Sequence, residues 1–130
     1  WEVRSSPAVS RALKGFNDLL ESGGKDGFYC CYTCTVPFLR TLAVVKPNEW
    51  DTVLEKGLDR VQKARKPDGR WHGFPFYYTL LALSEMDTPS ARNELRHASR
   101  VAERLLKRHE TDDRVLRFRG LALERALRAV

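Results

Sequence analysis

The 130-residue sequence has no long run of apolar residues. Stretches such as residues 41–45 are far too short to cross a bilayer, and no charged-then-apolar leader begins the chain. We therefore expect a single domain (residues 1–130) that spans no membrane and lies in the cytoplasm. Because the chain begins at Trp1 and not at a methionine, we also allow that it is a piece of a longer protein.

Cysteine is scarce and confined to one place. The three cysteines, Cys30, Cys31 and Cys34, all lie within one short segment. An odd, clustered count is unlike the paired cysteines of small secreted domains that disulfides hold together. We expect reduced thiols that pack as small apolar groups on a buried helix.

Two further absences narrow the fold and the chemistry. No stretch alternates apolar and polar residues as a half-buried strand does, so we predict no β-structure. The serines lack the strand–turn–helix elbow of a hydrolase nucleophile, and residues 23–25 (Gly-Gly-Lys) lack the spacing of a phosphate-binding loop. Neither class of enzyme is indicated.

Helical signals, in contrast, recur along the whole chain. The first predicted helix begins at Pro7 and is stopped by the glycines of residues 22–24. The second covers about residues 28–45, with a kink at Pro37, and the third lies between Pro47 and the turn at residues 66–69. The last three cover residues 76–86, 89–108 and about 113–129.

The chain also repeats itself. Residues 24–29 (Gly-Lys-Asp-Gly-Phe-Tyr) align with residues 66–71 (Lys-Pro-Asp-Gly-Arg-Trp), 42 residues later, and a degenerate third copy begins at residues 112–113. Each unit (6–45, 48–86 and 88–129) would contain an outer helix, a turn and an inner helix. Asp-Gly suits the left-handed turn that follows a helix, and the aromatic residue two positions after the glycine can fold back between the helices.

Two segments, Arg65-Lys66-Pro67-Asp68-Gly69-Arg70-Trp71 and Tyr77-Tyr78-Thr79-Leu80-Leu81-Ala82-Leu83, resemble the prenyltransferase and squalene-oxidase repeat. That repeat builds the α/α toroid of terpenoid cyclases and of protein prenyltransferase β-subunits. The resemblance covers roughly residues 8–86. It implies an all-α fold in which three helical hairpins form an open half of an α/α toroid.

The family's catalytic residues are not recognisable in this chain. Arg65 occupies the place of the repeat's usual glutamine, and the Asp-rich acid motif of the cyclases is absent. Protein prenyltransferases of the family bind zinc through Asp, Cys and His, so the resemblance implies a zinc site only if adjacent turns bring suitable residues together. The weak candidates are Asp26, Cys30, Cys34 and His72; we favour no cofactor and assign no catalytic residue.

A half-toroid would present a concave aromatic wall near its turns. The cleft that we expect to meet a ligand or partner is formed by Tyr29, Tyr32, Arg70, Trp71, His72, Phe74, Tyr77 and Tyr78. Tyrosines suit a partly wet surface, and such a surface needs covering by self-association, by a ligand or by a missing part of the parent chain. Alternatively, part of this set is simply core.

The net charge of +6 is concentrated on the predicted fifth helix. Five arginines recur there at every fourth residue and form one stripe on a helix: Arg92, Arg96, Arg100, Arg104 and Arg108. A solvated outer face is the ordinary explanation. The alternative is a docking surface for nucleic acid or an acidic partner, although no aromatic residue lies among the arginines.

The sequence therefore favours a non-catalytic, or catalytically orphan, prenyltransferase-like domain that presents an aromatic surface to a protein partner, a second copy of itself or an apolar ligand. One alternative is an isoprenoid-processing enzyme or a fragment of one, in which Arg70 or Lys66 meets a diphosphate. The other is a basic adaptor that uses the Arg92–Arg108 helix face.

Overall fold

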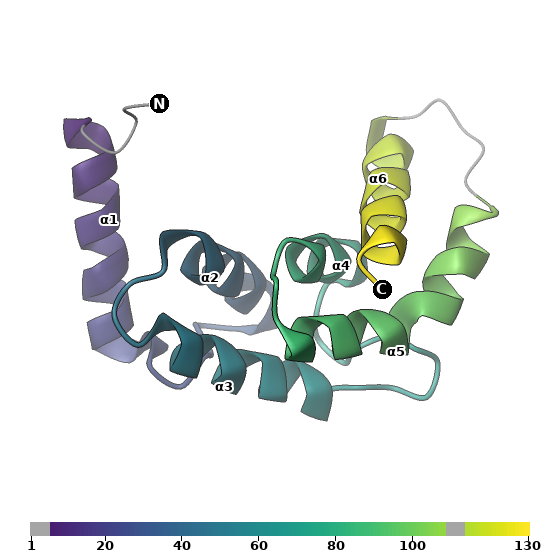
Figure 1. The fold of residues 1–130 in the computed structure, drawn as a ribbon, viewed down its shortest axis with the longest axis horizontal. Helices are drawn as coiled ribbons and strands as arrows, with labels where there is room; N and C mark the ends of the chain where they lie inside the picture. Colours follow the sequence, from purple (N-terminus) through teal and green to yellow (C-terminus); the bar gives the residue numbers. More distant parts are fainter. Residues whose placement is uncertain (1–5, 109–113) are drawn as a thin grey trace.

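The structure, a computed structural model, describes residues 6–108 and 114–130, and the side chains of residues 114–116 are not described. Within these residues the chain forms helices and no β-strand, so the predicted all-α fold class is confirmed (Figure 1). The helices are α1 (Pro7–Leu19), α2 (Tyr32–Val45), α3 (Trp50–Lys63), α4 (Phe76–Ser84), α5 (Pro89–Leu106) and α6 (Arg114–Arg128), with a π-helical turn η2 (Leu20–Gly24) after α1. The predicted third turn at residues 112–113 lies outside the described residues.

The helix starts follow local chemistry. Pro7 and Pro89 are the first residues of α1 and α5, where a missing N–H costs no hydrogen bond. The Thr88 side chain caps α5 by accepting the Ala91 N–H at 3.1 Å. The predicted start of the second helix near Phe28 is wrong, because Cys30 has a φ of 57°, which a right-handed helix does not accommodate. Helix α2 therefore begins at Tyr32 and continues past Pro37 to Val45.

The helices lie in two rows (Figure 1). In one row α2 packs on α4, and α4 packs on α6; in the other α3 packs on α5. Contacts of α2 with α3, of α4 with α5 and of α5 with α6 join the rows. This is the order expected for stacked hairpins with inner and outer helices, while closure of the rows into part of a ring stays a prediction.

One continuous apolar core runs between the rows. The largest fully buried apolar side chains come from five of the helices: Leu42, Leu54, Leu58, Leu80, Leu95 and Leu123. Helix α1 buries none of its residues and lies at the left edge of Figure 1, held by Leu20 and by the contact of Phe16 with Phe38. None of the described helices combines the length and the apolar character that a bilayer crossing requires.

Candidate functional site at the turn face

The two Asp-Gly turns have the same local structure. Gly27 and Gly69 have φ values of 75° and 84°, as predicted from the Asp-Gly pairs. In the first turn an Asp26 carboxylate oxygen accepts the Phe28 N–H at 3.2 Å. In the second, Asp68 accepts the Arg70 N–H at 3.1 Å. Each aspartate thus closes an Asx turn that fixes the chain direction after the preceding helical segment.

Trp71 folds back from the second turn into the core, as predicted for the aromatic residue beyond the glycine. Its side chain is buried, and its indole N–H donates a hydrogen bond to Glu94 at 2.9 Å. Glu94 is only 2% exposed and also accepts two hydrogen bonds from Arg65, at 2.7 and 3.1 Å. This buried network joins the second turn to α5 and gives Arg65 a carboxylate partner.

Tyr32 connects the first two hairpins. From the first turn of α2 its ring lies against the loop of the second repeat, 4.9 Å from the Phe74 ring and 6.4 Å from the His72 ring between centroids. Gly73 lies directly beneath the ring, where a Cβ atom would come within 2.4 Å of it. Tyr32 stays 40% exposed, whereas Phe74 is buried.

A hollow of about 410 Å³ opens beside this contact. It is lined by Tyr32, Arg60, Lys63, Ala64, Arg65 and His72. Two of the residues predicted for a ligand cleft, Tyr32 and His72, thus come together with three cations that lie outside the predicted cleft. The signal was present: these cations cluster at the end of the third helix, directly before the Asp-Gly turn.

Each cation of the hollow already has an acidic partner. Arg60 pairs with Asp26 at 2.7 Å, and Lys63 pairs with Asp59 at 2.6 Å. Arg65 pairs with the buried Glu94. Three carboxylates thus balance the three positive charges of the hollow, so a ligand must compete with at least one of these ion pairs.

The remaining residues of the predicted cleft do not form one continuous wall. Tyr29 stacks on Phe38, Arg70 lies over the Phe76 ring, and Tyr78 lies beside Arg40. Tyr77 packs against Arg119 of α6. Trp71 and Phe74 belong to the core. The aromatic set is thus divided among several contacts, and the hollow gathers only a part of it.

The three cysteines lie together at the start of α2. Their sulfur atoms are all within 4.8 Å of one another, close enough for the three to hold one metal ion. Cys30 and Cys31 are exposed and Cys34 is half-buried, so the expectation of thiols on a buried helix is wrong for the first two. The Cys34 N–H in the first turn of α2 lowers the pKa of the Cys31 thiol, and contact with Cys31 raises the pKa of Cys34 to about 11.

The zinc ligands that the family resemblance implies do not come together. Asp26 is bound to Arg60, and His72 lies against Tyr32. Among the described residues, neither belongs to a group of three or more potential metal ligands, whereas Cys31, which was not a candidate, joins Cys30 and Cys34. The residues present therefore do not fit the Asp–Cys–His site.

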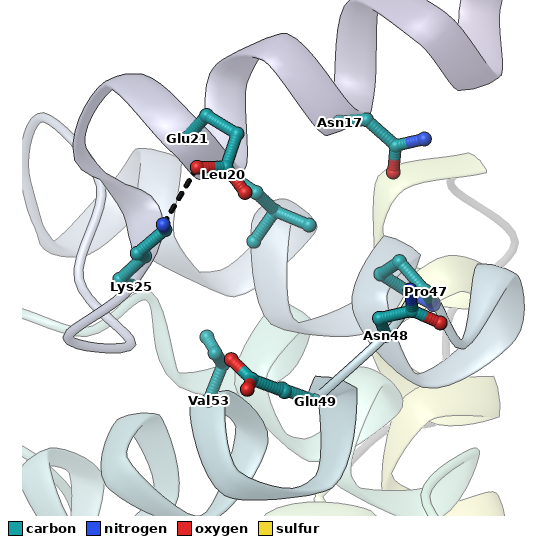
Figure 2. A pocket seen from close by; sticks show the side chains of 8 residues that line it. All are labelled: Asn17, Leu20, Glu21, Lys25, Pro47, Asn48, Glu49 and Val53. Carbon is teal, nitrogen blue, oxygen red and sulfur yellow. Dashed lines mark ion pairs between the residues drawn. The ribbon is translucent and has the colours of Figure 1, made fainter.

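A second hollow of about 400 Å³ lies between the end of α1 and the start of α3 (Figure 2). Its walls are Asn17, Leu20, Glu21, Lys25, Pro47, Asn48, Glu49 and Val53. Figure 2 shows that Glu21 and Lys25 face each other; they form an ion pair at 2.6 Å, and Glu21 raises the pKa of Lys25. No residue pattern predicts this polar hollow, because its walls come from two segments, residues 17–25 and 47–53, that only folding brings together.

Four arginines of the stripe lie on the exposed face of α5, whereas Arg108 lies in the turn after it, because α5 ends at Leu106 and not at the predicted residue 108. All five arginines are exposed, while Ala91, Leu95 and Ala98 are buried on the opposite face, as predicted. Arg92 pairs with Asp87. The other four, Arg96, Arg100, Arg104 and Arg108, form no ion pair with a residue that the structure describes.

Comparisons with known protein families, with curated proteins and with solved structures find no match for this chain. The resemblance to the prenyltransferase repeat therefore rests on the residues that carry it.

Proposed function

We propose that this chain is a non-catalytic, prenyltransferase-like α/α-repeat domain that binds a ligand at the hollow beside Tyr32. The observation that supports this proposal is the lining of the hollow, in which an aromatic ring and His72 lie next to three cations. Such a surface suits a ligand that combines an apolar or aromatic body with an acidic group. The body would pack on Tyr32, and the acidic group would meet the cations at the end of α3.

Lys63 is the cation that can turn to a ligand at the lowest cost. Its pair with Asp59 is an exposed contact one helical turn apart, and such pairs contribute only about 0.3–0.5 kcal/mol. Arg65, in contrast, is held by the buried carboxylate of Glu94. We therefore expect Lys63 to supply binding energy and Arg65 to shape the wall.

Calorimetric titration of the pure protein tests this proposal. The probe is geranyl diphosphate, with geraniol and inorganic pyrophosphate as its separate halves. We expect geranyl diphosphate to bind at least about tenfold more tightly than either half, and Lys63→Ala to weaken its binding about three- to tenfold. Lys107→Ala, which removes a cation from the end of α5, is the matched control. Absence of binding by all three probes, or an unchanged affinity in Lys63→Ala, would contradict the proposal.

The same sample distinguishes a binding domain from an isoprenoid-processing enzyme. A coupled assay for inorganic pyrophosphate should show no release from geranyl diphosphate above the rate without protein. Release that depends on the protein would replace the non-catalytic proposal with the enzymatic alternative.

A second candidate function rests on the arginine stripe. Four exposed arginines without an ion pair to described residues form a surface that suits nucleic acid or an acidic protein. Fluorescence anisotropy with a single-stranded DNA oligonucleotide and with poly-glutamate tests it at about 50 and about 200 mM salt. The charge reversals Arg96→Glu and Arg100→Glu should abolish binding, while Arg11→Glu on α1 should not. If the Arg96→Glu and Arg100→Glu variants bind as tightly as the Arg11→Glu control, this second candidate function is wrong.

Self-association is the remaining partner proposal. Phe118 and Leu121, adjacent on α6, are 43% and 49% exposed and could pack against a second copy. Sedimentation analysis should detect a dimer that the double variant Phe118→Ser, Leu121→Ser lacks. A monomer at every concentration would exclude it.

A further inference from the structure

The loop between the first Asp-Gly turn and α2 gathers the three cysteines through an unusual backbone. Cys30 has a φ of 57°, a left-handed conformation that is rare for any residue other than glycine. The Cys31 N–H donates to the Tyr29 carbonyl at 2.6 Å and closes a tight turn around Cys30. In an extended chain adjacent side chains point to opposite sides, whereas this turn lets all three sulfur atoms lie within 4.8 Å of one another.

Thr35 holds this loop in place from inside the protein. Its side chain is completely buried. The hydroxyl oxygen accepts the Tyr29 N–H at 3.0 Å and donates to the Cys31 carbonyl at 2.8 Å. The loop is therefore tied to α2 on both sides of Cys30. The strained conformation persists because the surrounding hydrogen bonds determine it, and such strain is typical of functional sites.

The arrangement fits a soft metal ion. Thiolate sulfur is the preferred ligand of Cu(I) and a common ligand of Zn(II). Three sulfur atoms that each bind one ion at about 2.3 Å are about 4 Å apart, so the thiols would close by less than about 1 Å from their present spacing.

The surroundings also suit such a site. The thiols lie at the N-terminus of α2, where the helix dipole stabilises the negative charge that three thiolates keep around one ion. Cys30 and Cys31 are exposed, so an ion can enter without unfolding the core.

We propose that Cys30, Cys31 and Cys34 form a three-thiolate site for one soft metal ion, Cu(I) or Zn(II). The site differs from the Asp–Cys–His zinc site of the protein prenyltransferases in its ligands. It goes beyond the proposed ligand hollow, because none of the three cysteines lines that hollow. Thr35 is its positioning residue.

Competition titrations of the full chain, reduced and kept free of oxygen, test the proposal. Cu(I) competes with bicinchoninate and Zn(II) with the chromophore 4-(2-pyridylazo)resorcinol, and Mg(II) serves as the hard-ion control in calorimetry. We expect one equivalent of Cu(I) or Zn(II) per chain, an ultraviolet thiolate-to-metal band and no binding of Mg(II). Comparison of the Cu(I) and Zn(II) titrations shows which of the two ions the site binds more tightly.

Single substitutions locate the site. Each of Cys30→Ser, Cys31→Ser and Cys34→Ser should weaken metal binding at least about tenfold, while Thr33→Ala, in the same segment, leaves it unchanged. Thr35→Val should weaken binding about tenfold while all three thiols still react with a disulfide reagent, which separates positioning from ligand loss. Far-ultraviolet circular dichroism checks that every variant is folded.

Two results would overturn the proposal. One is the absence of stoichiometric binding of either soft ion. The other is a folded Cys31→Ser variant that binds with the affinity of the original chain. In either case the three-thiolate site would be excluded, whatever the outcome of the geranyl diphosphate titration.

Discussion

The two Asp-Gly turns begin alike and end differently. Each has a left-handed glycine and an aspartate that accepts the N–H two residues later. After the second turn Trp71 enters the core and binds Glu94, whereas after the first its counterpart Tyr29 remains 36% exposed and stacks on Phe38. The turn itself therefore does not decide whether the following aromatic side chain is buried.

The length of the next loop accounts for part of the difference. Thr35 and Thr79 are equivalent buried threonines, each donating to the carbonyl four residues before it. Thr35 lies six residues after Tyr29, but Thr79 lies eight residues after Trp71. The two additional residues of the second repeat let the chain carry Trp71 inward before α4 begins. The shorter first loop instead turns sharply at Cys30 and leaves the thiols at the surface.

The largest difference between the turns should appear when their aromatic residues are removed. Trp71→Ala creates a cavity and leaves the buried Glu94 without one of its donors, so we expect a loss of about 4 kcal/mol in the free energy of unfolding. Tyr29→Ala should lose about 1 kcal/mol, because its ring is partly solvated already. Urea unfolding followed by circular dichroism measures both. Equal losses would show that the two aromatic side chains contribute equally to stability.

For substitution of the two turn glycines we expect the opposite order, with the larger loss of stability in the first turn. A Cβ at Gly27 would lie 2.2 Å from the Gly57 nitrogen on α3, whereas one at Gly69 would lie 3.3 Å from the His97 carbonyl. Both positions have positive φ, which costs an alanine about 1 kcal/mol. With the backbone clash added, Gly27→Ala should lose about 3 kcal/mol and Gly69→Ala between about 1 and 2 kcal/mol. A smaller loss in Gly27→Ala, measured by thermal unfolding, would mean that the first turn can move away from α3.

Substitution of the carboxylates that hold the two turns, Glu94 and Asp26, should give a smaller difference in stability. Glu94→Gln keeps an acceptor for Trp71 but leaves Arg65 without a buried counter-charge, so we expect a loss of about 2 kcal/mol. Asp26→Asn keeps the Asx acceptor and loses only an exposed ion pair with Arg60, at less than about 1 kcal/mol. High salt should reduce the loss of stability in Asp26→Asn, whose ion pair is exposed, and leave most of the loss in Glu94→Gln. Denaturant titrations of both variants at two salt concentrations measure this difference.

The sequence predicted those features that depend on a few neighbouring residues. Helix starts at Pro7 and Pro89, the left-handed glycines and the buried face opposite the α5 arginines are of this kind. It did not predict the partner of Arg65, because Glu94 lies on a different helix. It placed Tyr32 and His72 in a cleft but missed the cations beside them, since only the packing of two hairpins brings them together. The convergence of the cysteines depends on the backbone of Cys30, which no residue pattern indicates.

We expect the smallest difference in stability between substitutions of the two buried threonines, because their local hydrogen bonding is the most similar. Thr79→Val removes one buried hydrogen bond, to the Pro75 carbonyl, and should lose about 1 kcal/mol. Thr35→Val also leaves the Tyr29 N–H without its acceptor, so its loss should be about 1 kcal/mol larger. Urea titrations of the two variants under one set of conditions can detect that difference. If the losses are equal, Thr35 does not hold the cysteine loop, and the strain at Cys30 must be maintained by the contacts of Tyr29 and Tyr32.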